Sequence, residues 1–544
     1  MSEETVSGQQ VKTPAVIGVI GAGTMGAGIA QLACKTGAQT LMHDPVADAL
    51  TRGVERVAEG LAKEAQKGKL DPARLEHATQ QLRAVSTLEE LAPCELVIEA
   101  APERLELKHE LFGRLCEVVS DECVLASNTS SLPITAIAAV ASNPERVVGM
   151  HFFNPAPLMR LLEIVAGLLS GEQALALAKA TGEAMGKEVI LATDGPGFLV
   201  NRCNRPFGLE ALRLLQERVA DIESIDRIVR MGGGFRMGPF ELSDLVGVDT
   251  GFDVSKSFFE LSFGEPRWRP SPIQARQVAA GLHGRKTGRG YYTYSQNGPG
   301  READPEPPVA TAPQESEGLL VISGAGVLAD ELRQAAHQAG YDVQGPHEPL
   351  SELPGLIIEC GKPQESDALR GGPRLVLCSD GSLSALDPAG PAVGFHALPP
   401  FADCKLIELT RADSSSPAAI ARAERFFRAL GKQVEWVGDA PGLVLGRIVC
   451  QIINESAFAL GEAIGSAQDI DTGMVLGLNH PRGPLGWADA IGLDHVLAVL
   501  DALHEEYREE RYRAAPALRR LVRAGKLGRC TGGGFFDYPA PAAV

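Results

Sequence analysis

Short apolar runs alternate with longer mixed segments over the first third of the chain. Five such runs fall between residues 14 and 153, reading PAVIGVI, AQTLMHD, ELVIEA, CVLASN and VVGMHFF. Each has the length of a buried strand, and the segments between them are long enough for helices. This alternation predicts a parallel sheet covered by helices on both faces. Residues 46–92 carry apolar positions at helical spacing among many charges, which predicts a helical hairpin inserted after the second strand.

The pattern changes twice before residue 318. From Gly197 to about residue 290 it is nearly all helical, which predicts a separate all-α domain over 196–294 after an α/β domain over 14–195. Residues 295–317 are rich in Pro and Glu and show no periodicity. That composition predicts a linker.

The rest of the chain repeats the first half. VGFHALPPFADCKLIEL matches VGMHFFNPAPLMRLLEI, and DAPGLVLGR matches DGPGFLVNR, both at a constant offset of 245 residues. The offset is larger at the Gly-rich loop, so the second copy lacks about 43 residues where the first has its hairpin. We therefore predict a degenerate Rossmann-like domain over 318–438 and a second helical domain over 439–540.

The second copy has also lost polar and glycine positions. The third loop glycine is replaced by Ala329, and Pro399 and Gly446 stand where the first copy has Asn154 and Asn201. His396 and Glu408 survive, but without the hairpin and the complete loop. The second copy is thus predicted to serve as a scaffold.

Composition narrows the possible partners. The net charge of −18 argues against nucleic acid, whose phosphates require a basic face. Residues 1–13 are polar and acidic, unlike a signal peptide, and no apolar run approaches the roughly 20 residues that span a membrane. The ten cysteines show no ligand spacing, which predicts reduced thiols and no metal site. We expect a cytoplasmic protein with no nucleic-acid or membrane partner.

A glycine motif points to a dinucleotide. Gly21, Gly23 and Gly26 form a GxGxxG between a strand and a helix, where they permit a tight turn, close approach of a pyrophosphate and helix–strand packing. Asp44 ends the second strand about 20 residues further on. A carboxylate there accepts hydrogen bonds from the ribose hydroxyls and repels a 2′-phosphate, which favours NAD over NADP.

The segment GMHFFNPAPLMRLLE carries candidate acid–base chemistry. It contains His151 and Glu163, and a carboxylate on one imidazole nitrogen fixes the tautomer and leaves the other nitrogen to act as a base. Ser130, in SNTSS, and Asn201, in GFLVNR, could orient a substrate hydroxyl or carbonyl. Each of these two residues also has an ordinary structural interpretation, as a helix cap or a buried amide.

Several motifs together resemble the 3-hydroxyacyl-CoA dehydrogenase family: GAGTMG, VIEAAPE, SNTSS, HFFNP with the following Glu, PGFLVNR, GPFELSDLVG and GRKTGRGYY. The resemblance is dense over 14–294 and degenerate beyond. It implies a Rossmann-type NAD-binding domain followed by an all-α C-terminal domain. The two-copy layout is similar to the branch of the family that oxidises 3-hydroxyadipyl-CoA in phenylacetate catabolism.

The resemblance also implies residue roles. His151 is the base, Glu163 its partner, Ser130 and Asn201 orient the substrate, and Asn154 belongs to the same active-site motif. The implied NAD contacts are Gly21, Gly23, Thr24, Met25, Gly26, Asp44, Glu103 and Lys108. The hairpin corresponds to the element that reaches CoA, so Lys63, Lys67 and Lys69 are candidate CoA contacts.

The implied reaction is NAD-dependent oxidation of (3S)-3-hydroxyacyl-CoA to 3-oxoacyl-CoA, without an attached hydratase. The family usually dimerises through its helical domain, so we expect either a homodimer or a pseudo-dimer within one chain. Two alternatives remain open: a short-chain 3-hydroxybutyryl-CoA dehydrogenase, and a non-catalytic NAD-binding or structural member. A β-hydroxyacid dehydrogenase with a catalytic lysine would not explain HFFNP followed by Glu163.

Overall fold

A computed structural model describes residues 11–295, 300–313, 319–345, 353–361 and 372–539. The chain divides into two compact units. The first unit contains the residues up to Val200 together with Ala463–Leu478, and the second contains Asn201–Glu462 and the residues from Asn479 onward.

The first unit is built on an eight-stranded sheet with the order β3-β2-β1-β4-β5-β6-β7-β8. Its strands are β1 Val16–Ile20, β2 Gln39–His43, β3 Leu82–Val85, β4 Leu96–Glu99, β5 Val124–Ser127, β6 Val147–Phe152, β7 Leu161–Ala166 and β8 Glu188–Thr193. The five predicted strands are all present. Their near-continuous apolar sequences follow from burial on both faces of a mostly parallel sheet.

One strand pair breaks the parallel pattern. β6 and β7 run antiparallel, with His151 directly opposite Glu163 in the register. Directly opposed residues on an antiparallel pair project to the same face of the sheet. The strand pairing therefore brings together two residues that lie twelve positions apart in the sequence.

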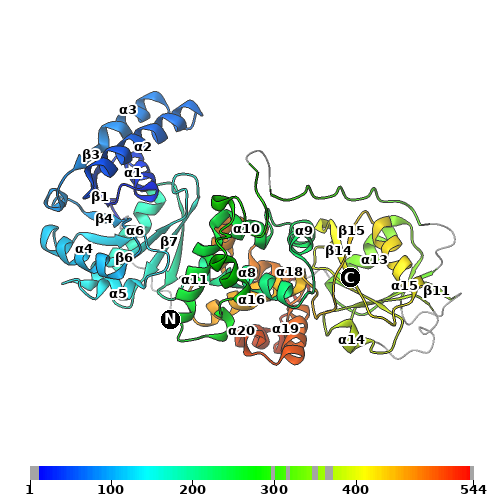
Figure 1. Cartoon of the computed structure of the whole chain (residues 1–544). Helices are drawn as coiled ribbons and strands as arrows, with labels where there is room; N and C mark the ends of the chain where they lie inside the picture. The colour runs from blue at the N-terminus through cyan, green and yellow to red at the C-terminus, as the bar shows by residue number, and fades with distance from the viewer. Residues whose placement is uncertain (1–10, 296–299, 314–318, 346–352, 362–371, 540–544) are drawn as a thin grey trace. The chain divides into compact units, whose positions relative to one another are not determined.

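The helices of the first unit cover this sheet. They are α1 Thr24–Lys35, α2 Ala47–Gln66, α3 Pro72–Gln81, α4 Leu105–Val118, α5 Ile134–Ala138 and α6 Glu172–Ala184, with α7 Val200–Cys203 at the boundary between the units. The predicted hairpin is α2 and α3, which extend beside α1 (Figure 1). It ends earlier than predicted, because residues 82–85 pair with β2 as the edge strand β3 instead of continuing the helix.

A helix from the second sequence copy belongs to the first unit. α17, Ala467–Leu478, packs on β7 and β8. Just before it, the carbonyls of Ala463 and Ile464 accept hydrogen bonds from Thr193. The continuous domain predicted for 439–540 is therefore divided by its contacts, which a boundary drawn from sequence repeats does not reveal.

The second unit contains two sets of helices related by the sequence repeat. They are α8 Arg205–Gln216, α9 Ile222–Gly233, α10 Pro239–Val246, α11 Val248–Leu261, α12 Pro272–Ala279, α16 Leu445–Gly461, α18 Pro484–Ile491, α19 Leu493–Tyr507 and α20 Pro516–Arg523. α8 packs against α16, its counterpart in the second copy. Arg447 on α16 donates to Glu210 and Glu217 from the first copy. The two copies of the helical domain thus form a pseudo-dimeric pairing within the chain.

Within the described residues, the second sheet repeats the first with one strand fewer. Its order is β10-β9-β11-β12-β13-β14-β15. The strands are β9 Leu319–Ser323, β10 Val343–Gln344, β11 Pro354–Glu359, β12 Arg374–Leu377, β13 Val393–His396, β14 Leu406–Arg411 and β15 Gln433–Trp436, with helices α13 Val327–Ala339, α14 Leu383–Leu386 and α15 Pro417–Ala429. The sequence deletion corresponds to α2, α3 and β3.

The predicted linker is only partly described, since residues 296–299 and 314–317 lie outside the described residues. Residues 300–313 have no helix or strand. Asp304 pairs with Arg230 on α9, and Glu306 accepts a hydrogen bond from Gln433 on β15. All ten cysteines are free thiols, as predicted. Within the described residues, no helix is both long and apolar enough to cross a membrane.

Candidate active site

The centre of the candidate site is the pair formed by His151 and Glu163. The imidazole Nδ1 lies 2.8 Å from Glu163 Oε2, and the glutamate side chain is fully buried. The other carboxylate oxygen, Oε1, accepts hydrogen bonds from the backbone N–H groups of Leu199 and Val200 at 2.8 and 3.2 Å. Because an ionised carboxylate only accepts, Nδ1 carries the proton and Nε2 is left as the basic nitrogen.

Aromatic side chains hold the imidazole in place. The ring centroid of His151 lies 4.6 Å from that of Phe153 and 5.8 Å from that of Phe198. Asn128, from the SNTSS segment, accepts a hydrogen bond from the Phe152 N–H at 2.8 Å. Within the described part of the chain, Nε2 of His151 makes no hydrogen bond, so the site presents an oriented base.

Glu103 organises the SNTSS loop. Its Oε1 accepts hydrogen bonds from Thr129 Oγ1 at 2.6 Å, from Ser131 Oγ at 2.9 Å and from the N–H of Ser130 at 3.0 Å. Burial acts to raise the pKa of Glu103, but these hydrogen bonds and the charge of Lys108 lower it overall. The structure gives Glu103 a loop-holding role, and its contact with NAD stays a prediction.

Lys108 is fully buried, which sequence reasoning did not anticipate. Its ammonium lies 2.8 Å from both oxygens of Glu99, 3.5 Å from Ser127 Oγ and 3.5 Å from Glu103 Oε2. A buried ammonium requires such partners, because desolvation of an unpaired charge is costly. In this geometry the buried ammonium of Lys108 helps to hold the carboxylate of Glu103 in position. Glu99, within VIEAAPE, is the residue that the sequence analysis missed.

The Gly-rich loop has the geometry that a dinucleotide needs. Gly21 has a φ of +96°, and a Cβ on Gly26 would lie 1.8 Å from Gly21 O. A Cβ on Gly23 would meet no atom within 4 Å, so the loop is open on that side. These features fit close approach of a pyrophosphate to the start of α1, where Thr24 is exposed and Met25 half-buried.

Asp44 reaches back to this loop. Its Oδ2 accepts a hydrogen bond from the Ala22 N–H and its Oδ1 from the Val46 N–H, at 2.8 and 2.9 Å. The carboxylate therefore lies beside the nucleotide turn, as a ribose-binding acid must. Arg56 on α2 also reaches the loop, with Nη1 3.5 Å from Ala22 O, and the sequence analysis did not place it there.

The remaining predicted site residues are not buried. Ser130 and Asn154 are exposed, and Asn154 precedes a cis proline. Asn201 directly follows Val200 in the chain and begins the second unit, so its role stays a prediction. The three candidate CoA lysines, at positions 63, 67 and 69, are exposed at the end of α2 and in the turn after it.

The second copy repeats the strand register without the bond. His396 lies opposite Glu408 on β13 and β14, yet the imidazole Nδ1 is buried with no hydrogen-bond partner. Its Nε2 lies 3.3 Å from Nε2 of His495. Burial, followed by the neighbouring His495, lowers the pKa of His396 well below its ordinary value. Burial also raises the pKa of Glu408 to about 8.

The second loop also differs from a nucleotide site. A cavity of about 240 Å³ lies beside residues 325–329 and is bordered by Asp380, Asp494 and His495. Arg333 donates to the carbonyls of Ile322 and Gly324 at the end of β9. The cavity is smaller than the roughly 300–1,000 Å³ of common ligand pockets. Its acidic border does not favour a pyrophosphate.

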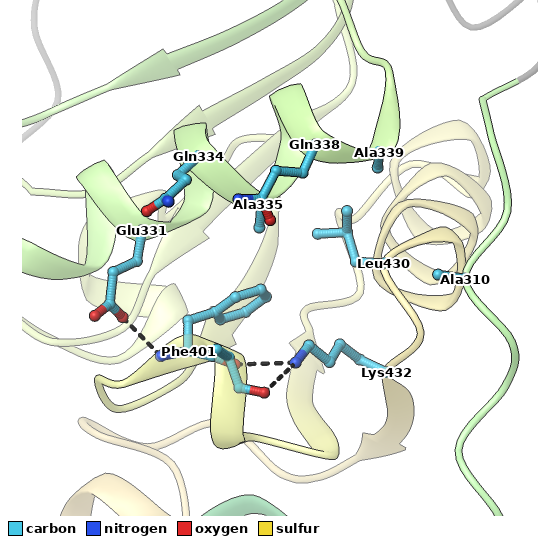
Figure 2. Close-up of a pocket in the computed structure, with 10 residues that line it drawn as sticks. Ala310, Glu331, Gln334, Ala335, Gln338, Ala339, Phe401, Leu430 and Lys432 are labelled. Atoms are coloured by element: carbon cyan, nitrogen blue, oxygen red, sulfur yellow. Dashed lines mark hydrogen bonds between the residues drawn. The ribbon is translucent and has the colours of Figure 1, made fainter.

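A second cavity, of about 400 Å³, opens where the first copy has its hairpin. In the first copy, Glu64 of α2 binds Gln31 and Lys35 on α1. Figure 2 shows the corresponding face of α13, with Glu331 accepting from the Phe401 N–H and Lys432 donating to backbone carbonyls. Glu331 and Lys432 thus make hydrogen bonds to backbone groups. We interpret the cavity as the space that the hairpin fills in the first copy.

A Rossmann unit with an intact glycine loop, an acid ending its second strand and an oriented histidine defines a dinucleotide-dependent dehydrogenase. Comparison with known families agrees with this class. The 3-hydroxyacyl-CoA dehydrogenase NAD binding domain matches residues 16–195, and the C-terminal domain of the same family matches 197–294 and again 442–538. The 3-hydroxybutyryl-CoA dehydrogenase reduced Rossmann-fold domain matches 384–441.

Some individual relatives cover nearly the whole chain, and others only its first half. It is 36% identical over 503 residues to the 3-hydroxyadipyl-CoA dehydrogenase of Escherichia coli K12, covering 92% of this chain and 96% of that protein. A probable 3-hydroxybutyryl-CoA dehydrogenase of Deinococcus radiodurans is 40% identical over 277 residues, covering 51% and 99%. A crystal structure of a 3-hydroxybutyryl-CoA dehydrogenase from E. coli K12 is similar with a TM-score of 0.80 and 36% identity, covering 94% and 100%.

The chain belongs to the 3-hydroxyacyl-CoA dehydrogenase family. It is an NAD-dependent oxidoreductase that acts on 3-hydroxyacyl-CoA. The chain contains two sequence copies, and the second copy has a reduced Rossmann domain. The predicted family, fold class, cofactor and enzyme class are confirmed. The names of the relatives differ in the acyl group that they specify.

Proposed function

We propose that His151 is the general base of the first copy. Its Nε2 removes the proton from the C3 hydroxyl of a (3S)-3-hydroxyacyl-CoA, and Glu163 stabilises the imidazolium that forms. When bound beside the Gly21–Gly26 loop, NAD supplies the acceptor for the hydride that leaves C3. The observation that carries this proposal is the 2.8 Å bond from Nδ1 to a fully buried carboxylate. Ser130, Asn154 and Asn201 orient the substrate.

The proposed substrate is 3-hydroxyadipyl-CoA, in the catabolism of phenylacetate. Support comes from the E. coli relative of that name, which matches the two-copy chain over nearly its whole length. The alternative substrate is 3-hydroxybutyryl-CoA, favoured by relatives that match only the first copy and by the name of the similar crystal structure. Catalytic efficiency for the two substrates, measured by NADH formation, decides between them. A preference for 3-hydroxybutyryl-CoA would reject the proposed substrate.

The second copy acts as a scaffold in this proposal. It contributes α17, whose Gly477 packs against Leu161 and against Phe153, the ring that contacts His151. Its own histidine is buried and its loop is bordered by acids. Calorimetric titration should therefore give one NAD per chain. Two NAD equivalents per chain would reject the scaffold role.

A further inference from the structure

One lysine of the first unit carries a buried ammonium that binds only backbone carbonyls. Lys187 lies just before β8, and its Nζ donates to Ala156 O at 2.5 Å and to Met159 O at 2.6 Å. In the described part of the chain it forms no ion pair. Burial, followed by the charge of Lys35, lowers the pKa of Lys187 to about 8, and Glu64 acts against this shift. A lysine is rarely buried without an acidic partner, so the two carbonyl bonds need an explanation.

Both carbonyls belong to the loop that follows His151. Residues 153–160 connect β6 to β7, and they begin with Phe153, whose ring centroid lies 4.6 Å from that of His151. Asn154, which we propose to orient the substrate, is the next residue of the same loop. Among the described residues, Lys187 makes the only side-chain hydrogen bonds to this loop. Lys187 is thus the polar anchor of the segment beside the base.

On another side the loop packs against α1, the helix that begins at the Gly-rich loop. A Cβ on Gly28 of this helix would lie 2.9 Å from Cδ of Pro157 and 3.2 Å from Cβ of Ala156. The close approach therefore requires a glycine, which has no side chain that could bind the loop. The helix α1 contributes packing to the position of the loop, and the hydrogen bonds come from Lys187.

The second copy holds the equivalent loop with two side chains instead of one. Lys432, at the position of Lys187, donates to three backbone carbonyls of residues 401–404. Glu331, at the position of Gly28, accepts a further bond from a backbone N–H of the same segment (Figure 2). The fold therefore uses the lysine in both copies, but only the first copy has an oriented base beside the loop. The two lysines form a matched pair that can separate a role in the chemistry from a role in folding.

We infer that Lys187 is a positioning residue for the reaction: its ammonium fixes residues 153–160, so that Phe153 and Asn154 keep their places beside His151. This inference rests on the proposed function, in which His151 is the base and Asn154 orients the substrate. Lys187 acts only through the loop, by its two carbonyl bonds. A misplacement of about 1 Å in a site of this kind can reduce a rate about 10²-fold. Release of the loop should therefore slow the reaction without removing any reacting group.

The test compares Lys187→Met with Lys432→Met in the full-length protein. Each substitution leaves buried carbonyls without their donor, so the melting temperature should fall in both variants. The kcat for NADH formation should fall about 10–10²-fold in Lys187→Met, because the loop beside His151 is released. In Lys432→Met it should stay near that of the wild type. The affinity for NAD, measured by calorimetric titration, should match the wild type in both variants, since neither substitution alters the Gly21–Gly26 loop. A loss confined to kcat in one variant is not what general destabilisation produces.

Three results would overturn the inference and leave the proposed function intact. They are an unchanged kcat in Lys187→Met, equal losses of kcat in the two variants, and a parallel fall of kcat and NAD affinity in Lys187→Met. Should Lys187→Met not fold, Lys187→Gln takes its place, because the amide keeps a donor on a side chain one atom shorter. An unchanged kcat in Lys187→Gln would then reject the positioning role. Turnover that survives in His151→Gln would instead reject the proposed function, and this inference with it.

Discussion

The two copies hold the same histidine and glutamate in the same strand register, but only one copy bonds them. His151 lies 2.8 Å from Glu163, whereas His396 binds His495 and leaves Nδ1 without a partner. The two antiparallel strand pairs are otherwise equivalent. Strand register therefore brings the two side chains opposite each other, and something beyond the register decides whether they interact.

The backbone after each sheet supplies the difference. In the first copy both backbone donors, Leu199 and Val200, use one oxygen of Glu163, which leaves the other for the histidine. In the second copy, Val444 and Leu445 donate to different oxygens of Glu408. Each oxygen of Glu408 thus already accepts one backbone bond, whereas Oε2 of Glu163 has no backbone donor and accepts only from the histidine.

The position equivalent to Asn201 adds a steric cause. A Cβ on Gly446 would lie 2.2 Å from Cε1 of His396, so the imidazole occupies space that a side chain would need. Because burial raises the pKa of Glu408 to about 8, its carboxyl holds a proton near neutral pH and cannot stabilise an imidazolium. The second copy has therefore kept both titratable residues, His396 and Glu408. It lacks the hydrogen bond between them because the residues around the pair differ.

The largest expected effect is the difference in kcat between substitutions of Glu163 and of Glu408. Glu163→Gln should reduce kcat about 10²–10⁴-fold, because the amide no longer stabilises the imidazolium of His151. Glu408→Gln should retain turnover close to the wild type, since Glu408 does not bind a histidine. Steady-state NADH formation measures both. Comparable losses in the two variants would contradict the division of roles.

The next effect concerns the helix that the second copy contributes. A side chain at Gly477 would approach Leu161 at 2.8 Å and Phe153 at 3.3 Å, so Gly477→Val should cost about 1–3 kcal/mol in stability and displace Phe153 from the imidazole. Turnover and melting temperature should both fall. Gly232→Val is the matched variant at the equivalent position of α9, where a Cβ would meet Leu445 and a carbonyl at 3.3–3.4 Å. Its turnover should fall less, and a reversed order would reject the supporting role of α17.

A pH effect of intermediate size tests the buried histidines. Burial lowers the pKa of His495 to about 4 and that of His396 well below 6.5, so the unfolded chain binds more protons as pH falls below about 6.5. Stability should therefore decrease between about pH 6.5 and 4.5, by up to about 1.4 kcal/mol per pH unit for each histidine. Glu408 has the opposite effect. Because its pKa is raised to about 8 in the folded protein, Glu408 increases stability as pH falls, by up to about 1.4 kcal/mol per pH unit.

The variant that sharpens this test is His495→Thr, which introduces the residue that the first copy has at position 250. Urea unfolding at several pH values should show a loss of stability that is shallower than in the wild type by about 1.4 kcal/mol per pH unit. Parallel pH profiles for the two proteins would mean that His495 does not titrate differently on unfolding.

The smallest effect concerns the hairpin that only the first copy has. Replacing Lys63, Lys67 and Lys69 by Gln should raise KM for acyl-CoA a few-fold, because exposed ion pairs contribute about 0.2–1 kcal/mol each. The difference should shrink as salt is added, since exposed charges are screened. An increase in KM that is independent of salt would assign the effect to something other than charge.

Much of this fold follows from local pattern. The glycine loop, the buried strands and the constant offset between the copies predict both sheets and the pairing of His151 with Glu163. The hairpin end was not predictable, because residues 82–85 are too few to show a period and their conformation depends on pairing with β2. The placement of α17 on β7 depends on packing between segments far apart in sequence.

The types of residue in the site could be predicted from the sequence, but most of the contacts between them could not. Which oxygen of a carboxylate a backbone N–H uses depends on distances of a few tenths of an ångström, and no sequence pattern records it. The burial of Lys108 behind Glu103 likewise arises from the network with Glu99.

The central claim is that the first copy performs the chemistry and the second does not. The most direct test compares NADH formation by His151→Gln and His396→Gln in the full-length protein, with the acyl-CoA substrate that the wild type prefers. We predict a loss of about 10²–10⁴-fold in kcat for His151→Gln. Turnover of His396→Gln should remain near that of the wild type. Activity that survives in the first variant and is lost in the second would contradict the account.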